Sequence, residues 1–486
     1  MPSNRVVRLR TDDTAVVATL HEGIARIQAE LEVTTDFPPE VQQAAARAAA
    51  APRLPDLDRT DLAFVTIDPE SAQDLDQAVH VQRDTDAHGG AGYVVHYAIA
   101  DVAAFVTAGD PVDLEANRRG ETLYGADSKV PLHPPVISED AASLLPDQVR
   151  PALLWTIRVD ESGEGTDIRV ERALVRSRAK LSYEDAQAMI DDGTASESLL
   201  LVKEIGEKRI ARDAARGGVS LPLPDQEIDI ADGHWKLEYR SLLPVEEWNA
   251  QISLLTGFGA ASLMVYARVG LLRTLPDPDP RDVQRLHRTA RALGVEWPAE
   301  MLYPDFIRTL DPDRADHAAV ILASARLLRG SGYVAFDGEV PAEPQHSALA
   351  SEYAHVTAPL RRLADRYAGE VCVALCAEQP VPAWVVAALA ELPSTMQRSS
   401  RRAHSYERHV VDLVEAALLV DRVGEEFEAV IVAVDEKSPE RGTAMVRSLG
   451  VEAPVTGTGD LPLGHDVRVR LDEADVHDRR VRFRLL

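Results

Sequence analysis

The sequence is poor in cysteine and aromatic residues and has no excess of positive charge. Two cysteines among 486 residues, Cys372 and Cys376, are too few for a disulfide framework or a cysteine-rich zinc site, so we expect buried, reduced thiols. Acidic residues outnumber basic ones by 79 to 52, giving a formal net charge of −27. This charge argues against a protein that coats nucleic acid, but it leaves room for a nucleic-acid enzyme with a positively charged channel.

Long apolar runs are also scarce. The best candidate, TGFGAASLMVYARVGLL at 256–272, contains Arg268 and falls short of the roughly 18 residues that a bilayer span requires. The first residues, MPSNRVVRLRTDD, turn polar before a signal-peptide apolar region can form. We therefore expect a cytoplasmic protein that does not contact a membrane.

Helical and strand patterns alternate along the chain. An Ala- and Gln-rich helical segment at 11–50 precedes a Pro-containing linker at 51–58. Strand patterns follow up to about residue 183, and the clearest is GYVVHYAIAD, where Tyr93, Val95, Tyr97 and Ile99 share one face. Helical patterns then occur at 184–216, 246–273, 280–330, 358–378 and 383–424.

The last sixty residues return to strand patterns. Five short runs separated by Gly, Pro and Asp turns fit a small OB-type barrel, which often binds single-stranded nucleic acid, although a purely structural barrel is an alternative. We therefore predict an α+β fold in three parts. These are a helical N-terminal segment at 1–55, a domain with a mixed β-sheet core and surrounding helices at 56–424, and an OB-fold barrel at 425–486.

The most informative segment is the acidic loop TIDPESAQDLDQAV, residues 66–79. Asp68 ends a predicted strand, and Asp74 and Asp76 lie two residues apart before the next one, so their side chains point to the same side of an extended chain. Carboxylates that converge without a basic partner repel one another unless a cation lies between them. Oxygen ligands without His or Cys favour Mg²⁺ or Mn²⁺ over zinc. A solvated acidic turn is the alternative on composition alone.

This segment resembles the signature of the RNB family, the ribonuclease II and ribonuclease R exoribonucleases. The resemblance continues in order over about residues 56–420 through HYAIADVAAFV, GDPVDLEANRRGETLY, VPLHPPVISEDAASLLPDQVRPAL, RAKLSYEDA, GGVSLPLP, VEEWNAQISLL and HSALASEYAHVTAPLRRLADR. It implies an RNB catalytic domain followed by an RNA-binding OB domain. It also implies a Mg²⁺-dependent hydrolytic exoribonuclease that degrades single-stranded RNA from its 3′ end to nucleoside 5′-monophosphates. We expect it to be monomeric.

The resemblance also assigns site residues. Asp68, Asp74 and Asp76 match three of the four metal-site aspartates of the family, and Asp76 is expected to be the least dispensable. The fourth position holds Gln77, which costs one negative charge and puts a second metal ion in doubt. Arg361 and Arg362 match the arginine pair that faces the metal, where a guanidinium grips phosphate oxygens; one of the two is available to pair with Asp365 instead.

Further positions are expected to contact RNA. Tyr124 matches an aromatic that stacks on the base near the 3′ end, Tyr183 a second site tyrosine, and Glu246 a contact to the terminal nucleotide, with Glu247 as the alternative. The family's other base-stacking aromatic falls where this chain has Leu221. His346, Tyr353 and His355 are expected to be structural. Arg398, Arg401, Arg402 and Arg408 form a basic cluster that contacts either RNA or a nearby acidic surface.

Some features depart from the family. Cold-shock-type domains commonly precede the acidic block, whereas here only about 55 mostly helical residues do, so we expect those domains to be replaced and the path to the site to be more open. The departures at Gln77 and Leu221 leave a second hypothesis open, an RNA-binding regulator that kept the fold but has weak or no hydrolysis. A third is an exonuclease that prefers structured or modified RNA ends.

Overall fold

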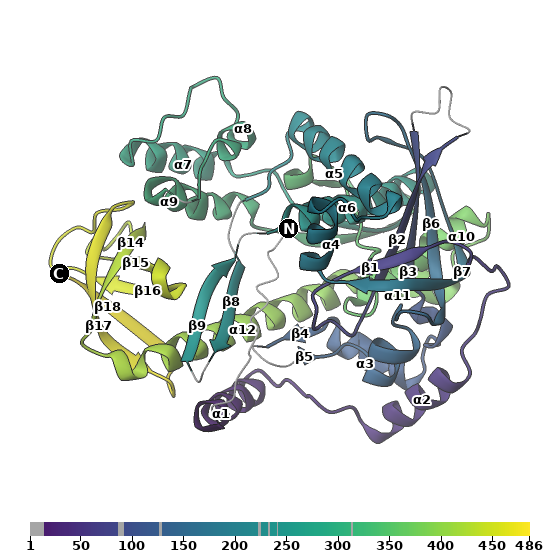
Figure 1. Cartoon of the computed structure of the whole chain (residues 1–486), viewed down its shortest axis with the longest axis horizontal. Coiled ribbons are helices and arrows are strands. Elements are labelled where there is room, and N and C mark those ends of the chain that lie inside the picture. The colour runs from purple at the N-terminus through teal and green to yellow at the C-terminus, as the bar shows by residue number, and fades with distance from the viewer. Residues whose placement is uncertain are drawn as a thin grey trace.

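The structure is a computed structural model that describes residues 14–85, 92–125, 129–221, 225–231, 234–240, 242–312 and 314–486. A five-stranded barrel forms the centre of its larger part (Figure 1). The barrel consists of β1 (Phe64–Ile67), β2 (Gln77–Asp84), β3 (Gly92–Ala100), β6 (Val149–Val159) and β7 (Gly165–Leu181). The strands follow the order β1-β2-β3-β6-β7, and β1 pairs in parallel with β7 to close the sheet, while the other pairs are antiparallel. The predicted mixed β-sheet core is confirmed.

Strand β3 is buried along its whole length. The expected alternation is confirmed, because Tyr93, Val95, Tyr97 and Ile99 all belong to one hydrophobic core. The strands share this core with helices α5 (Glu197–Arg216), α6 (Pro244–Ala267) and α10 (Leu363–Cys376). On the other face of the strand, Ala98 and Ala100 belong to a second core with residues of α2 (Pro39–Ala50). The two faces of this strand therefore contribute to two different hydrophobic cores.

Helices surround this barrel. They are α2 (Pro39–Ala50), α3 (Pro111–Arg119), α4 (Tyr183–Asp191), α5 (Glu197–Arg216), α6 (Pro244–Ala267), α10 (Leu363–Cys376), α11 (Ala383–Leu389) and the N-terminal end of α12 (Leu392–Leu419). Helix α1 (Thr14–Glu30) packs instead against α12 and a second, C-terminal barrel. Short strand pairs join β4 (Leu123–Tyr124) to β5 (Lys129–Val130), β8 (Asp225–Ala231) to β9 (His234–Arg240), and β12 (Gln345–His346) to β13 (Ser351–Glu352).

The predicted helix over 246–273 is wrong at its C-terminal end. Helix α6 stops at Ala267, because Arg268 takes a left-handed conformation with φ of 59°. The chain then forms β10 (Val269–Thr274), which pairs with β11 (Gly332–Asp337). Between these strands lie α7 (Pro280–Ala292), α8 (Tyr303–Arg308) and α9 (Ala315–Ser324), which have a small core of their own around Leu286 and Phe306.

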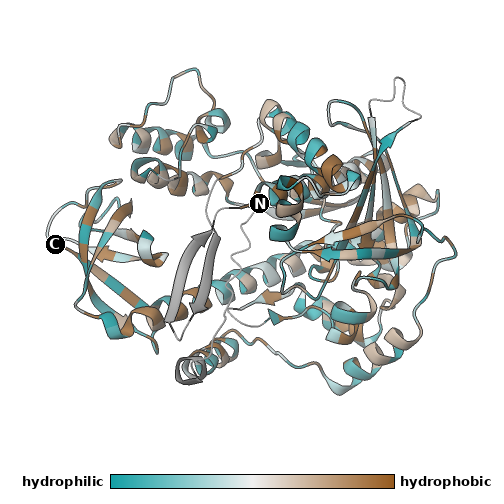
Figure 2. Ribbon diagram, viewed as in Figure 1, coloured by the Kyte–Doolittle hydropathy of each residue, from teal (hydrophilic) through white to brown (hydrophobic). Residues whose placement is uncertain are grey.

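Within the described residues, α6 is the one helix long and apolar enough to cross a membrane by length and composition. Half of its most apolar stretch is buried inside the protein, and one such helix is weak evidence for a membrane span. The helices beside the first barrel, α6 among them, show hydrophobic and hydrophilic residues side by side (Figure 2). Trp248, Ile252 and Leu255 of α6 contribute to the core shared with β3.

The five predicted C-terminal strands are confirmed. Strands β14 (Glu426–Val434), β15 (Arg441–Val446), β16 (Val451–Thr456), β17 (Asp466–Asp475) and β18 (Arg480–Leu485) close a second barrel in the order β14-β15-β16-β18-β17. Residues of α1 and α12 pack into one core with this barrel, and α9 packs against it through Ala315 and Leu322. Helix α12 runs between the two barrels and connects them (Figure 1).

The close approach of α5 and α6 gives a test of the packing. A Cβ atom at Gly206 would lie 2.5 Å from Cβ and 2.7 Å from Cα of Trp248. We expect Gly206→Ala to lower the free energy of unfolding by about 1–3 kcal/mol, the usual cost of overpacking. Urea denaturation measures this. Gly332→Ala is the control, because no heavy atom lies within 4 Å of its added Cβ, and an equal midpoint shift in both variants would contradict the prediction.

Candidate active site

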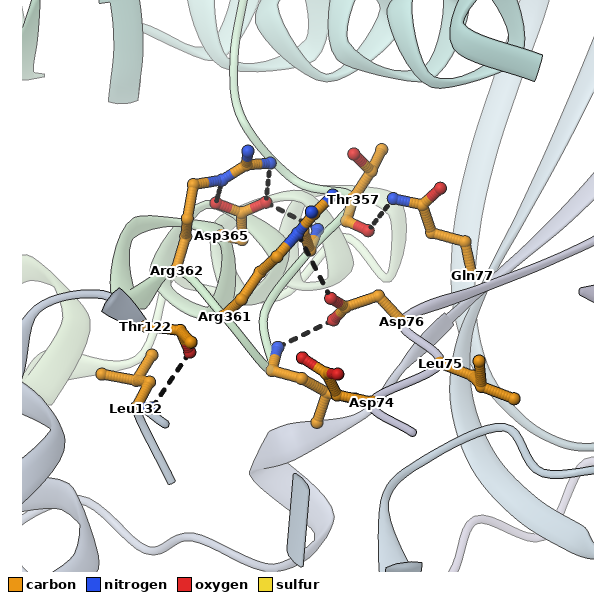
Figure 3. Close-up of polar contacts among 12 residues, drawn as sticks. Asp74, Leu75, Asp76, Gln77, Thr122, Leu132, Thr357, Arg361, Arg362 and Asp365 are labelled. Carbon is orange, nitrogen blue, oxygen red and sulfur yellow. Dashed lines mark hydrogen bonds and ion pairs between the residues drawn. The ribbon is translucent and has the colours of Figure 1, made fainter. Parts of the chain in front are cut away.

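The acidic loop lies where the sequence placed it, between the first two strands of the first barrel. Strand β1 ends at Ile67 and β2 begins at Gln77, so Asp68 follows one strand and Asp76 directly precedes the other. Leu75 is fully buried, and the carboxylates of Asp74 and Asp76 lie on the opposite side of the chain from it (Figure 3). The predicted common orientation of these two carboxylates is confirmed.

Asp76 joins the acidic loop to a distant segment that precedes α10. Its Oδ1 accepts a 2.8 Å hydrogen bond from the backbone N–H of Leu360, and its Oδ2 lies 3.7 Å from Nε of Arg361 (Figure 3). Asp76 is 4% exposed. Burial raises its pKa well above the usual value, while Arg361 and the Leu360 N–H act in the opposite direction. The Asp76 carboxylate therefore depends on these two partners to carry its charge.

The other two aspartates have different environments. Asp74 forms a 2.5 Å ion pair with Nζ of Lys129, which also lies 3.0 Å from Glu139. Asp68 has one buried carboxylate oxygen, Oδ2, without a hydrogen-bond partner among the described residues. Burial raises the pKa of Asp68 to about 6, against the opposing effect of Arg361, and the negative charge of Asp74 adds to the rise.

Gln77 is held by three hydrogen bonds. Its Nε2 donates to the carbonyl of Thr357 at 2.7 Å, and its Oε1 accepts from the hydroxyl of Tyr97 at 2.6 Å and from that of Ser253 at 3.4 Å. The amide therefore connects β2 to β3, α6 and the segment before Arg361. Both ends of the side chain are engaged, so Gln77 serves here as a structural link.

The residues present fit a hard divalent cation in donor chemistry. Asp68 offers an unpartnered oxygen, and the charge of Asp74 raises the pKa of both Asp68 and Asp76, an effect that a bound cation would oppose. Among the described residues, however, no group of three or more His, Cys, Asp or Glu side chains is close enough to hold a metal ion. Lys129 and Arg361 compensate part of the negative charge instead. The metal assignment stays a prediction.

The two arginines divide their roles. Arg362 forms two 2.9 Å hydrogen bonds with both carboxylate oxygens of Asp365, which also accepts from the N–H of Ala358. The pairing of one arginine with Asp365 is therefore confirmed, and that arginine is Arg362. Arg361 points toward Asp76, and its side chain is 33% exposed. Of the pair, Arg361 is the one whose guanidinium is not engaged by Asp365.

The segment before β4 brings Tyr124 to the arginines. Thr122 N–H donates to the carbonyl of Arg361, and Leu363 N–H donates to that of Gly120. Tyr124 is half-buried, and burial raises its pKa, while the charge of Arg361 lowers it and those of Asp74 and Asp76 raise it further. Tyr124 therefore lies beside the acidic loop, as the sequence predicted, and its stacking role stays a prediction.

Two other residues that are predicted to contact RNA lie in the first turns of helices. Tyr183 is the first residue of α4 and half-buried, and its charge affects the pKa of Tyr97. Glu246 is at the third position of α6, where Oε1 accepts a 3.0 Å hydrogen bond from the N–H of Leu243. This bond caps the helix. Neither geometry tests the predicted contact with RNA.

The basic cluster lies on α12, and Arg402 contacts the end of α3, next to the Gly120–Thr122 segment that pairs with the Arg361 segment. Arg398 donates to the hydroxyls of Ser394 and Thr395 on its own helix, and Arg402 donates to the carbonyl of Arg119 at 2.6 Å. Arg401 and Arg408 are exposed. The described residues contain no acidic side chain in an ion pair with any of these four arginines. Their contact with RNA stays a prediction.

Other sequence expectations have clear positions. Leu221 packs against the core of α7–α9. Among the expected structural residues, His355 shares a 2.7 Å hydrogen bond with the hydroxyl of Tyr333 and, like His346, lies edge-on to Tyr353. Both cysteines are free thiols, with Cys372 buried and Cys376 half-buried.

Two lysines near the acidic loop were missed by sequence reasoning. Lys129 neutralises Asp74, and Lys180, near the end of β7, donates to the carbonyls of Glu70 and Ala72 at 2.6 and 2.7 Å. Each lies more than fifty residues from the loop that it contacts. Lys129 lies between two of the blocks that resemble the family, GDPVDLEANRRGETLY and VPLHPPVISEDAASLLPDQVRPAL, so the resemblance did not point to it.

The raised pKa of Asp68 predicts a pH dependence. The pKa of Asp68 is about 6 in the folded state and 3.8 in the unfolded chain, so the folded state binds the proton more tightly. Protonation of Asp68 therefore stabilises the fold, and this contribution is complete below about pH 4. This contribution is lost as pH rises from about 4 through 6. In a chelator, we expect the melting temperature of wild type to fall across this range relative to Asp68→Asn. Parallel pH profiles of the two proteins would contradict the assignment.

The Arg362–Asp365 pair predicts a contrast in stability. Arg362→Met leaves a buried carboxylate without its partner, so we expect a loss of about 3–5 kcal/mol in the free energy of unfolding. Arg361→Met removes a longer, more exposed contact, so the loss should be smaller. Denaturant midpoints of the two variants measure the difference, and equal losses would mean that Arg362 does not have the structural role inferred here.

Comparison with known proteins agrees with this geometry. Residues 57–375 match the RNB domain family, and residues 425–486 match the RNase II-type exonuclease C-terminal S1 domain. Curated relatives include ribonuclease R of Aquifex aeolicus, 27% identical over 88% of this chain and 64% of its own length, and exoribonuclease 2 of Serratia proteamaculans, 28% identical over 82% and 61%. The chain spans about half to two thirds of the length of such relatives.

Solved structures show the same fold. Mycoplasma genitalium RNase R in complex with ribose methylated single-stranded RNA superposes with a TM-score of 0.84 at 19% identity, over 96% of this chain and 78% of that one. Yeast Ssd1, described as a pseudonuclease, gives 0.70 at 15% identity, over 90% of this chain and 55% of that one. With an acidic loop, an arginine segment and a terminal β-barrel arranged as described, and an RNB match over most of its length, the chain belongs to the RNB family.

Proposed function

We propose that this protein is a 3′→5′ exoribonuclease that hydrolyses single-stranded RNA to nucleoside 5′-monophosphates with Mg²⁺, or alternatively Mn²⁺. The observation that carries the proposal is the meeting of the acidic loop with the Arg361 segment through Asp76, beside Tyr124. Family membership supports the reaction type, and the RNase R neighbour with single-stranded RNA supports the substrate.

The chemistry follows from the side chains around Asp76. Tyr124 stacks on the base at the 3′ end, a contact that is indifferent to sequence. Arg361 holds the scissile phosphate through its non-bridging oxygens and stabilises the charge that develops there. A divalent ion bound by Asp68, Asp74 and Asp76 would supply Lewis acidity at that phosphate. Water attacks the phosphorus, the bond to the ribose 3′-oxygen breaks, and that oxygen takes up a proton.

Asp76 has a positioning task as well. The Leu360 N–H fixes one carboxylate oxygen, which leaves the other directed toward Arg361. Lys129 holds Asp74 in a similar way from the β4–β5 hairpin that carries Tyr124. The base-stacking ring and the acidic loop are therefore connected through one ion pair.

A second function is favoured by two observations. Gln77 replaces a family aspartate and is fully engaged in hydrogen bonds, and the described residues hold no preformed three-ligand metal group. Resemblance to Ssd1, described as a pseudonuclease, fits the same reading. The alternative is therefore an RNA-binding protein with the RNB fold and weak or no hydrolysis.

Digestion of a 5′-labelled oligoadenylate separates the two functions. With Mg²⁺ or Mn²⁺, a ladder that shortens from the 3′ end supports the exoribonuclease. A gel shift of the same oligonucleotide without shortening, under every metal and pH condition, supports the RNA-binding protein.

The central position of Asp76 predicts that its substitution lowers the rate of RNA hydrolysis but not the affinity for RNA. We expect Asp76→Asn to reduce turnover by at least about 10²-fold, because the amide has lost the charge that faces Arg361 and the metal. RNA affinity, measured by fluorescence anisotropy in a chelator, should change little. Asp56→Asn is the control, since Asp56 is exposed on the linker. Near-normal turnover in Asp76→Asn would show that the site is assigned wrongly.

A further inference from the structure

An open cavity of about 480 Å³ lies on α7, in the helical segment between β10 and β11. One wall is a single helix face, because Gln284, His287, Arg288 and Arg291 follow the i, i+3, i+4, i+7 spacing. The other wall comes from the segment after α7 and includes Trp297. No residue assigned to the acidic site lines this cavity.

The floor of the cavity is an aromatic stack. The rings of His287 and Trp297 stack with centroids 3.6 Å apart, and Trp297 stacks on Phe306 at 4.0 Å. Phe306 is fully buried, so His287 is the outer ring and lines the cavity. Trp297 Nε1 donates to the carbonyl of Met301, which fixes the middle ring. A planar group that enters the cavity would meet the His287 ring, the outer member of this stack.

Two cations flank the stack. Arg288 and Arg291 are exposed, and neither forms an ion pair within the part of the chain that the structure describes. The arginines of β17 and β18 differ, because their acidic neighbours already neutralise them: Arg468 and Arg470 pair with Glu426, Arg482 with Glu473, and Arg484 with Asp472. In a chain of net charge −27, the free guanidinium groups beside the cavity favour an anionic ligand.

The cavity lies close to the C-terminal barrel, and this position limits which part of an RNA strand can reach it. Helix α7 is joined to the C-terminal barrel by a 2.9 Å ion pair between Arg285 and Glu436, and α9 packs on the same barrel. Figure 1 shows α7–α9 next to the C-terminal barrel and away from the β1–β2 end of the first barrel. A strand whose 3′ end lies at the acidic loop can reach α7 only with nucleotides further toward its 5′ end.

We propose that this cavity is a second RNA-binding site, in which one base of the 5′-ward single strand stacks on His287 while Arg288 and Arg291 contact the adjacent phosphates. Aromatic side chains and guanidinium groups are the usual partners of unpaired RNA bases and their phosphates. The proposal rests on the proposed function, since it requires RNA that occupies the acidic site with its 3′ end.

The test compares short and long RNA in a chelator, where hydrolysis is prevented. The probes are labelled oligoadenylates of about 5 and about 25 nucleotides, the second longer than the roughly 4–16 nucleotides that one OB-type barrel covers. Arg288→Gln/Arg291→Gln should bind the long probe more weakly and lower the slope of log K against log salt by about 1.4, at about 0.7 for each phosphate contact. His287→Ala should lose about tenfold in affinity for the long probe.

Short-probe affinity and short-probe hydrolysis should stay at wild-type values in all these variants. Arg326→Gln/Arg329→Gln is the control, because it removes the same charge from exposed positions after α9 that do not line the cavity. Circular dichroism and melting temperature verify folding, and His287→Gln is a milder second variant.

The outcomes distinguish this proposal from the proposed function. Suppose that wild type binds and shortens RNA but the α7 variants keep wild-type affinity and salt slope for the long probe. The RNA site on α7 is then refuted, and the ligand of its arginines is another anion, such as an acidic protein. An equal loss in the Arg326/Arg329 control also refutes it, because general charge then explains the effect. If wild type binds neither probe, the proposed function itself fails.

Discussion

The hydrogen bond from the Leu360 N–H to Asp76 joins two chain segments that lie 284 residues apart. One segment is the acidic loop between β1 and β2, and the other leads into α10 and carries Arg361. Gln77 makes a second connection between them through the carbonyl of Thr357. These contacts place a carboxylate against a guanidinium at the end of a closed barrel. The candidate site therefore depends on these two segments remaining packed against each other.

Charge compensation sets the character of this site. Burial raises the pKa of Asp68 and Asp76, so their ionised forms require nearby positive charge or hydrogen-bond donors. Lys129, Arg361 and the Leu360 N–H meet part of that requirement. The buried Oδ2 of Asp68 has no hydrogen-bond partner among the described residues. In a chain of net charge −27, Lys129 and Arg361 therefore bring positive charge to the acidic loop.

Much of the fold was accessible from local patterns. Alternation along β3 and the five short terminal runs correctly predicted the strands, because each pattern reflects burial of one face of a strand. The helix predicted through residue 273 failed at Arg268, where a single left-handed residue ends α6 and the following apolar residues enter a sheet. An apolar run has the same composition in a helix and in a buried strand, so pattern alone does not separate them.

The sequence by itself determined the chemical groups of the site, the loop that carries three aspartates and the strands on either side of it. Only the tertiary structure decided which arginine faces Asp76, because Arg361 and Arg362 are adjacent and differ only in which of them reaches Asp365. It also decided that Lys129 neutralises Asp74 and that Gln77 is a structural link. The physical reason is that charge pairing and burial depend on distances between remote segments, which a linear pattern does not contain.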